Sequence, residues 1–386
     1  MKRGKSRSRI ALLGMGIIGG GPLGQGIPAI KDLFLFLSTH YDIEFYSFKR
    51  VDLLKVPRSI QVRQPASWRI PDRIKYMTMA IRLVLNHLRN PYDLIFGISA
   101  FPTGQYAVIL SRVIRRPVIV QFIDREGVCI ADIGFGNLCQ PWLHKITQWV
   151  SEHATALVMV SDYQKRVANE SMALSRGIDV LPLRINPLNF RFIERKITFP
   201  VQFVHIAYYH QVKDQHTLFT CFADVARKID CHLTVIGSGY ETSEVEELLK
   251  KLKLVSKVTF KGALPYSQIP NQFNTAHIMI HTSRFESCCL VMQEAMASGV
   301  AVCGTHVGIL ADLGDRYGII VQPKDASRPA SKILDLIENE ELYERITKNA
   351  YQWITEHNEA WANENYRRLI DSLLESPQSR NHNELS

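Results

Sequence analysis

The chain has 386 residues, of which 46% are hydrophobic and 22% are charged, and a formal net charge of +9 at pH 7. This length exceeds what one hydrophobic core usually supports, so we expect two domains. No apolar run approaches the roughly eighteen residues that span a bilayer, which argues against a membrane-spanning protein. A positive charge alone does not indicate nucleic-acid binding, and no recognisable nucleic-acid-binding module is present.

The chain begins with a basic tail over residues 1–9, followed by an apolar run and a cluster of glycines at Gly19, Gly20 and Gly21. We predict a buried strand over residues 10–13 that turns at these glycines. A secretory signal peptide is the alternative, because a basic start followed by an apolar run imitates one. The glycine-broken run and the lack of a small-residue cleavage site favour the strand.

Apolar strands then alternate with helical stretches, which predicts an α/β fold with doubly wound parallel sheets. In the first half, strands are expected at residues 10–13, 43–48, 92–97, 117–122 and 156–160, with helices at 27–39 and 163–172. The domains expected from this pattern are a first Rossmann-like domain over 10–190, a linker over 191–200 and a second Rossmann-like domain over 201–355. The polar tail over 376–386 is expected to be disordered.

Residues 73–89 read as a basic amphipathic helix. Such a helix could lie on an anionic membrane surface. It could equally be an ordinary helix whose apolar side packs on the first sheet. The sequence leaves both alternatives open.

The seven cysteines are odd in number and lack metal-type spacing, so we expect reduced thiols in a cytoplasmic protein. The adjacent Cys288 and Cys289 are interpreted as small packing residues that let the backbone approach a ligand. His205, His281 and His306 also lack zinc-ligand spacing, and core or surface roles are expected for them.

The most informative stretch is residues 285–299, in which Glu286 and Glu294 are eight positions apart. If a helix begins near Ser287, these side chains lie about 80° apart on it, near the same face. Unpaired N–H groups at the start of such a helix bind anions, and carboxylates accept hydrogen bonds from hydroxyls. This combination suits a nucleotide-diphosphate sugar. The alternative is an amphipathic helix with two surface glutamates.

This stretch resembles the Glu-x7-Glu signature of the retaining glycosyltransferases of family four, which have the two-domain GT-B fold. The segments 204–214, 233–239, 258–262 and 278–283 resemble the strands and turns of the second domain in that family, in the same order. The resemblance covers about residues 200–355. It implies two facing Rossmann-like domains and a C-terminal helix, here 356–375, that returns to the first domain.

The resemblance also implies roles for individual residues. Glu286 would bind the sugar and Lys213 the diphosphate, as the catalytic pair, and Glu294 would bind the ribose. The other donor-binding candidates are Ser287, Cys288, Cys289, Leu290, Gly237, Gly239, Gly20 and Gly21. On the acceptor side, Asp124 and Glu126 could supply polar contacts.

Two positions depart from the family pattern. Tyr208 stands where the family commonly has an arginine, and Ile123 where it often has a histidine. These substitutions support the alternative of a non-catalytic partner protein with the same fold. A sugar-nucleotide epimerase is a further alternative, which the helix after Glu286 disfavours.

The function implied is the transfer of a hexose from a nucleotide-diphosphate sugar to a glycan or lipid-linked acceptor, in surface polysaccharide biosynthesis. No metal and no cofactor are expected, because the family uses a lysine and helix-end dipoles in their place and the chain has no Asp-x-Asp pair. The resemblance implies a cytoplasmic enzyme, which could attach peripherally to the inner face of a membrane. Neither the acceptor nor the oligomeric state is predicted.

Overall fold

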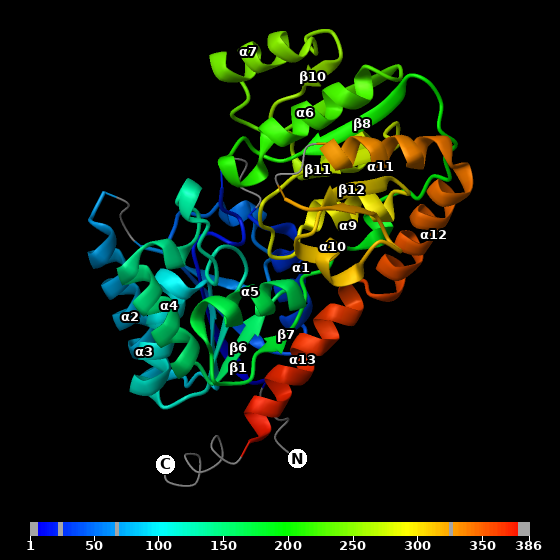
Figure 1. Cartoon of the computed structure of the whole chain (residues 1–386). Coiled ribbons are helices and arrows are strands. Elements are labelled where there is room, and N and C mark those ends of the chain that lie inside the picture. The colour runs from blue at the N-terminus through cyan, green and yellow to red at the C-terminus, as the bar shows by residue number, and fades with distance from the viewer. Residues whose placement is uncertain (1–6, 22–25, 66–68, 324–326, 377–386) are drawn as a thin grey trace. The chain divides into compact units, whose positions relative to one another are not determined.

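The structure is a computed structural model that describes residues 7–21, 26–65, 69–323 and 327–376. These residues group into two compact units (Figure 1). The first unit contains the chain up to Leu183 and from Glu359 onward, and the second runs from Arg184 to Asn358. Most of the predicted basic tail, and all but the first residue of the predicted polar tail, lie outside the described residues.

The first unit is built on a seven-stranded parallel sheet with the order β3-β2-β1-β4-β5-β6-β7. The strands are β1 (Arg9–Gly14), β2 (Asp42–Ser47), β3 (Gln61–Arg63), β4 (Leu94–Ile98), β5 (Val118–Phe122), β6 (Ala156–Met159) and β7 (Asp179–Val180). The helices are α1 (Pro28–Leu37), α2 (Asp72–Arg89), α3 (Gln105–Ile114), α4 (Pro141–His153), α5 (Asp162–Met172) and α13 (Glu359–Glu375).

The second unit contains a six-stranded parallel sheet with the order β10-β9-β8-β11-β12-β13. Its strands are β8 (Val201–Ile206), β9 (Cys231–Ile236), β10 (Val258–Phe260), β11 (Ile278–His281), β12 (Ala301–Thr305) and β13 (Ile319–Val321). Its helices are α6 (Gln215–Ala226), α7 (Ser243–Leu252), α8 (Ile269–Phe273), α9 (Leu290–Ala297), α10 (Gly308–Leu313), α11 (Ser327–Glu338) and α12 (Glu340–Glu356).

The central strands are almost entirely buried, because helices cover the sheets and both faces must be apolar. In the second unit β8 pairs with β9 on one side and with β11 on the other. From β8 the chain continues to β9 on one side, whereas from β11 it continues to β12 on the other side. In open α/β sheets, ligands bind beyond the carboxyl ends of strands at such a switch point.

The predicted α/β fold class is confirmed, and the returning C-terminal helix is α13, which groups with the first unit. Tyr366 of α13 is buried there, and its hydroxyl donates to the carbonyl oxygen of Leu181 at 2.6 Å. Among the described residues, no helix is long and apolar enough to cross a bilayer.

The segment predicted as the linker, residues 191–200, groups with the second unit instead. The reason is Arg195, which is buried and donates to the carbonyl oxygens of Ser298 at 2.6 Å and Phe273 at 2.8 Å. The backbone N–H of Ile193 also donates to the Ser298 carbonyl. These bonds hold the segment on its own domain, and the division between the units lies before Arg184.

The prediction that all seven cysteines are reduced is wrong for two of them. Cys129 and Cys139 form a disulfide. The loop between them folds back through a hydrogen bond from the Ile130 N–H to the Phe135 carbonyl at 2.8 Å. This fold brings the two Cα atoms to 4.8 Å, within the range that a disulfide requires. The other five cysteines are free and buried.

Candidate active site

The two predicted catalytic residues lie together beyond the carboxyl edge of the second sheet. Lys213 follows β8, and Glu286 follows β11, the two strands at the switch point. The Lys213 ammonium donates to Oε1 of Glu286 at 2.6 Å. Their side chains are only 14% and 12% exposed, so the pair is largely shielded from water.

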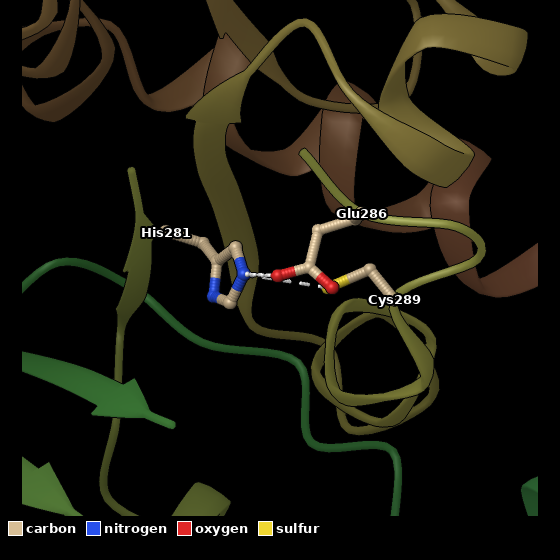
Figure 2. Close-up of side chains that lie close together, drawn as sticks. All are labelled: His281, Glu286 and Cys289. Carbon is tan, nitrogen blue, oxygen red and sulfur yellow. Dashed lines mark hydrogen bonds and ion pairs between the residues drawn. The ribbon is translucent and has the colours of Figure 1, made fainter. Parts of the chain in front are cut away.

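Oε1 of Glu286 accepts two further hydrogen bonds, from His281 and Ser283. Nε2 of His281 donates at 2.7 Å, as Figure 2 shows. The Ser283 hydroxyl, which the figure does not draw, donates at 2.6 Å. Burial alone would raise the pKa of Glu286, but the Lys213 cation and the His281 bond outweigh burial and lower it well below the usual range. Glu286 is therefore ionised at neutral pH. Because these three bonds converge on Oε1, Oε2 keeps capacity to accept hydrogen bonds from a ligand.

Lys213 is held by its backbone as well as by its side chain. It ends a 3₁₀ turn, η6 (Gln211–Lys213), and the Thr282 hydroxyl donates to the carbonyls of Lys213 and Asp214, each at 3.0 Å. Burial would lower the pKa of the Lys213 amine, but the Glu286 carboxylate raises it above its usual value, so the amine is protonated. Tyr208, the residue at the usual arginine position, places its ring 5.6 Å from the ammonium.

The helix that carries Glu294 begins later than predicted. α9 starts at Leu290, and its preceding residue, Cys289, has φ +59° in the left-handed region. Such a backbone cannot continue a helix toward the N-terminus, so Glu286 and Ser287 lie in a loop before it. The helical spacing assumed for Glu286 and Glu294 therefore does not apply.

Glu294 lies on α9 in an environment opposite to that of Glu286. Its side chain is buried, and burial raises its pKa to about 7 despite a hydrogen bond from Tyr266. No cation lies beside it to offset desolvation, as far as the described residues show. The alternative of two surface glutamates is wrong, because both side chains are largely buried.

His281, Glu286 and Cys289 offer one imidazole nitrogen, one carboxylate oxygen and one sulfur within 4.8 Å of one another (Figure 2). This is a set that could in principle bind a metal ion. The Lys213 ammonium, however, contacts the same Glu286 oxygen, and burial raises the pKa of the Cys289 thiol well above its usual value. A dication would have to displace one positive charge and deprotonate that thiol, so the set fits a cation poorly.

The glycine candidates occupy positions where another residue would clash or adopt a strained backbone. A Cβ on Gly237 would lie 1.9 Å from the Ala207 carbonyl oxygen, and one on Gly20 would lie 2.2 Å from the Gly16 carbonyl oxygen. Gly239 and Gly21 have φ of +90° and +80°, which favour glycine. These four positions shape turns that follow β9 and β1.

The two acceptor-side candidates follow β5 in the first unit and differ in exposure. Asp124 is exposed, whereas Glu126 is buried and accepts a hydrogen bond from the Asp124 N–H at 2.8 Å. Burial, and then the Asp124 charge, raise the pKa of Glu126 to about 7. Ile123 at the usual histidine position is half-buried beside them.

Sequence reasoning missed His281 and Ser283. His281 was expected in a core or surface role, yet its side chain is buried against Glu286. A signal was available, because both residues follow the apolar part of β11, where side chains at the carboxyl end of a strand line a site. His205 of β8 is the core histidine that was expected: burial lowers its pKa to about 3.

Residues 189–353 match the family model for glycosyl transferases group 1. The match contains all six strands of the second sheet together with Lys213, Glu286 and Glu294. The second unit is a group 1 glycosyltransferase domain. The predicted family resemblance is confirmed at this level, and it supports enzymatic activity.

The chain is also similar to curated proteins whose names refer to glycosyl groups or their transfer. The N-acetyl-alpha-D-glucosaminyl L-malate synthase of Bacillus anthracis is 28% identical over 156 residues, which cover 40% of this chain and 40% of that protein. One component of the phosphatidylinositol N-acetylglucosaminyltransferase of Arabidopsis thaliana is 24% identical over 287 residues, covering 71% of this chain and 61% of that protein. The chain thus spans less than two thirds of either relative.

Solved structures extend the likeness over both units. Sucrose-phosphate synthase from Thermosynechococcus elongatus matches with a TM-score of 0.79 at 16% identity, covering 95% of this chain and 99% of that one. Anabaena HepE, solved with UDP and glucose, matches with a TM-score of 0.75 at 16% identity, covering 95% and 100%. At this level of identity the likeness shows the fold, which is GT-B.

Proposed function

We propose that this group 1 protein is a retaining, metal-independent glycosyltransferase that moves a hexose from a nucleotide-diphosphate sugar. The observation that carries the proposal is the Lys213–Glu286 pair, shielded from water and joined by His281 and Ser283. It lies beyond the strand ends where ligands of such sheets bind. A buried, fully ionised pair is costly to maintain as a structural element alone, which favours a role in binding and catalysis.

Lys213 would act on the leaving group. As the sugar–phosphate bond breaks, negative charge builds up on the diphosphate, and a preorganised ammonium stabilises that charge more than it stabilises the ground state. A protonated lysine supplies this positive charge without a metal, in keeping with the poor fit of the nearby donor set to a cation.

Glu286 would hold the sugar. Its pKa is lowered, so it stays a carboxylate and can accept hydrogen bonds from sugar hydroxyls, each contributing roughly 1.5–3 kcal/mol. His281 and Ser283 fix its orientation from the protein side. Glu294 would bind the ribose, with the backbone of residues 287–290 approaching the phosphates.

The donor and acceptor are inferred from similar proteins. HepE was solved with UDP and glucose, so a UDP-hexose is the first donor to test. The Arabidopsis relative is named for phosphatidylinositol, which favours a glycan or lipid-linked acceptor. We place the reaction in surface polysaccharide biosynthesis, in the cytoplasm at the inner face of a membrane.

The test is donor turnover. The purified chain is incubated with UDP-, GDP- and ADP-linked hexoses, with and without a membrane extract, and nucleotide release is followed by mass spectrometry. We expect release from one donor, lost in Glu286→Gln. Retention is then checked from the anomeric configuration of the product by NMR. No release from any donor together with no nucleotide binding would instead favour the non-catalytic alternative, consistent with Tyr208 and Ile123.

A further inference from the structure

Helix α2 of the first unit has two apolar sides, and only one of them is used by the fold. Met79 and Leu83 are buried against the core of that unit, together with the stem of Lys75. On the opposite side, five apolar side chains are 43–73% exposed, and we call them the outer row: Ile74, Met77, Ile81, Leu85 and Leu88. The folded unit does not explain why they are apolar.

The outer row is continuous. Its members are spaced three or four residues apart, which at about 100° per residue places them within a sector of about 80° along the helix. Helix α3 lies beside α2 (Figure 1) and exposes Ile109 and Val113, one turn apart. The two helices thus present several exposed large aliphatic side chains, where isolated ones are the norm.

Arginines surround this apolar surface. Arg73, Arg82 and Arg89 are exposed on α2 next to the outer row, and Arg112 and Arg115 are exposed at the end of α3. From the first residue of α2, residues 72–116 contain seven lysines and arginines and two acidic residues, Asp72, which pairs with Lys75, and Asp93. Asp93 is engaged in the fold, because its carboxylate accepts the Arg9 N–H at 2.9 Å.

Apolar side chains flanked by arginines match the interface of an anionic bilayer. The aliphatic row can enter the boundary between headgroups and acyl chains, while the arginines extend to lipid phosphates. Each basic residue near an anionic surface contributes about 1 kcal/mol. A protein partner would need a surface that is both apolar and acidic, whereas a bilayer with anionic lipids offers both over any area.

We propose that α2 and α3 form a membrane-docking surface that binds anionic lipid bilayers through the outer row and its flanking arginines. Docking is peripheral, with α2 lying in the plane of the interface. It uses residues of the first unit only, so it does not depend on Lys213 or Glu286. The sequence left two alternatives for residues 73–89, a helix packed on the first sheet or a helix on a membrane. In this proposal both apply, because the inner side packs on the fold and the outer side contacts lipid.

The test is co-sedimentation of the full chain with vesicles. One set contains phosphatidylcholine alone and the other an equimolar mixture with phosphatidylglycerol. We expect binding to the anionic vesicles only, weakened by salt. The variant Arg73→Glu, Arg82→Glu, Arg89→Glu should bind about a hundredfold more weakly. The matched control reverses three exposed lysines of the second unit, Lys250→Glu, Lys251→Glu and Lys253→Glu, and should bind as the wild type does.

A second variant tests the apolar row: Met77→Gln, Ile81→Gln and Leu85→Gln should also lose binding. Because all three side chains are exposed, the thermal unfolding midpoint should change little, and circular dichroism checks this. Failure of the wild type to bind anionic vesicles would overturn the proposal. So would an equal loss in the lysine control, or a dimer in sedimentation equilibrium that the glutamine variant dissociates, since the row would then bind a second copy.

Discussion

Glu286 and Glu294 are the same residue type in one stretch of chain, yet their environments shift their pKa values in opposite directions. Glu286 is buried beside the Lys213 ammonium, and its pKa is lowered. Glu294 is buried without such a cation, and its pKa is raised to about 7. One carboxylate is therefore charged throughout the physiological range, whereas the other changes its charge within it.

The raised pKa of Glu294 predicts a pH-dependent stability difference. Between pH 4.5 and 7 the folded state retains a proton that the unfolded state has lost, so this residue makes the protein less stable as pH rises through that window. Glu294→Gln removes the effect. Urea unfolding should show the variant gaining on the wild type by at most about 1.4 kcal/mol per pH unit, and levelling off above pH 7.

The control for this measurement is Glu246→Gln on α7, where the glutamate is exposed. This variant makes the same chemical change at an exposed position, so it separates the effect of burial from that of the substitution itself. Glu126, whose pKa is also raised, is present in all three proteins and cancels in the comparison. A flat difference for Glu294→Gln across the window would contradict the assigned burial of this carboxylate.

The sequence pointed to Lys213 and Glu286 as candidates but not to the residues that surround them. A motif records residues at fixed spacing, and the two catalytic candidates belong to such motifs. His281 and Ser283 contact Glu286 only because the loop after β11 brings the Glu286 side chain back to the end of that strand. Their role therefore depends on the fold of this loop. The pKa difference between the two glutamates was likewise invisible, since burial and a distant lysine set it.

At the scale of elements, α6 depends on an unusual N-cap. Asp214 has φ +49° in the left-handed region, and its carboxylate accepts hydrogen bonds from the N–H and the hydroxyl of Thr217 at 3.2 and 2.8 Å. The same residue follows Lys213 and so connects the candidate site to the helix. Asp214 therefore affects stability in two ways: its carboxylate caps the helix, and its left-handed backbone would be strained in most other residues.

We expect Asp214→Ala to lower the free energy of unfolding by about 2 kcal/mol, because it removes the cap and places alanine in a strained conformation. Asp214→Gly should cost less, about 0.5 kcal/mol or below, because glycine relieves the strain and is itself tolerated at an N-cap. Thr242→Ala is the matched control: Thr242 caps α7 from an extended backbone, and its loss should cost about 1 kcal/mol. Equal losses for alanine and glycine at position 214 would contradict the strained cap.

Element types and order were predictable because alternating strands and helices leave a strong apolar pattern. The start of α9 was not, since a non-glycine residue in the left-handed region, Cys289, has no sequence signature. The Cys129–Cys139 disulfide was missed for a related reason. An odd count of cysteines suggested free thiols, whereas the pairing depends on how one loop folds back.

At the scale of the whole molecule, the chain returns to its first unit through α13. The Tyr366 hydroxyl donates to the Leu181 carbonyl and accepts a hydrogen bond from the side chain of Gln121. On the same helix, Asp371 accepts the Tyr41 hydroxyl at 2.5 Å. Residues more than 180 positions apart are thus joined within one unit, so the unit gains these contacts only when the end of the chain is present.

Tyr366→Phe should destabilise the first unit by about 2 kcal/mol, because it leaves the buried Gln121 amide and the Leu181 carbonyl without their partner. Hydrogen exchange followed by mass spectrometry should show faster exchange in β5 and β6, with exchange in the second unit unchanged. Tyr351→Phe on α12 of the second unit is the control and should leave the first unit as it is. Unchanged protection in Tyr366→Phe would show that α13 contributes little to this unit.

If the pair formed by Glu286 and Lys213 is the reaction centre of a nucleotide-sugar transferase, removing the carboxylate should abolish turnover. The most direct measurement compares nucleotide release by the wild type, Glu286→Gln and Glu44→Gln. Glu44 is also a buried, ion-paired glutamate, but it lies on β2 of the first unit with Arg9 and Arg63. We expect Glu286→Gln to lose about a hundredfold or more in turnover, while Glu44→Gln, once folded, keeps the wild-type turnover. Release by Glu286→Gln at the wild-type rate would rule out this role for the pair.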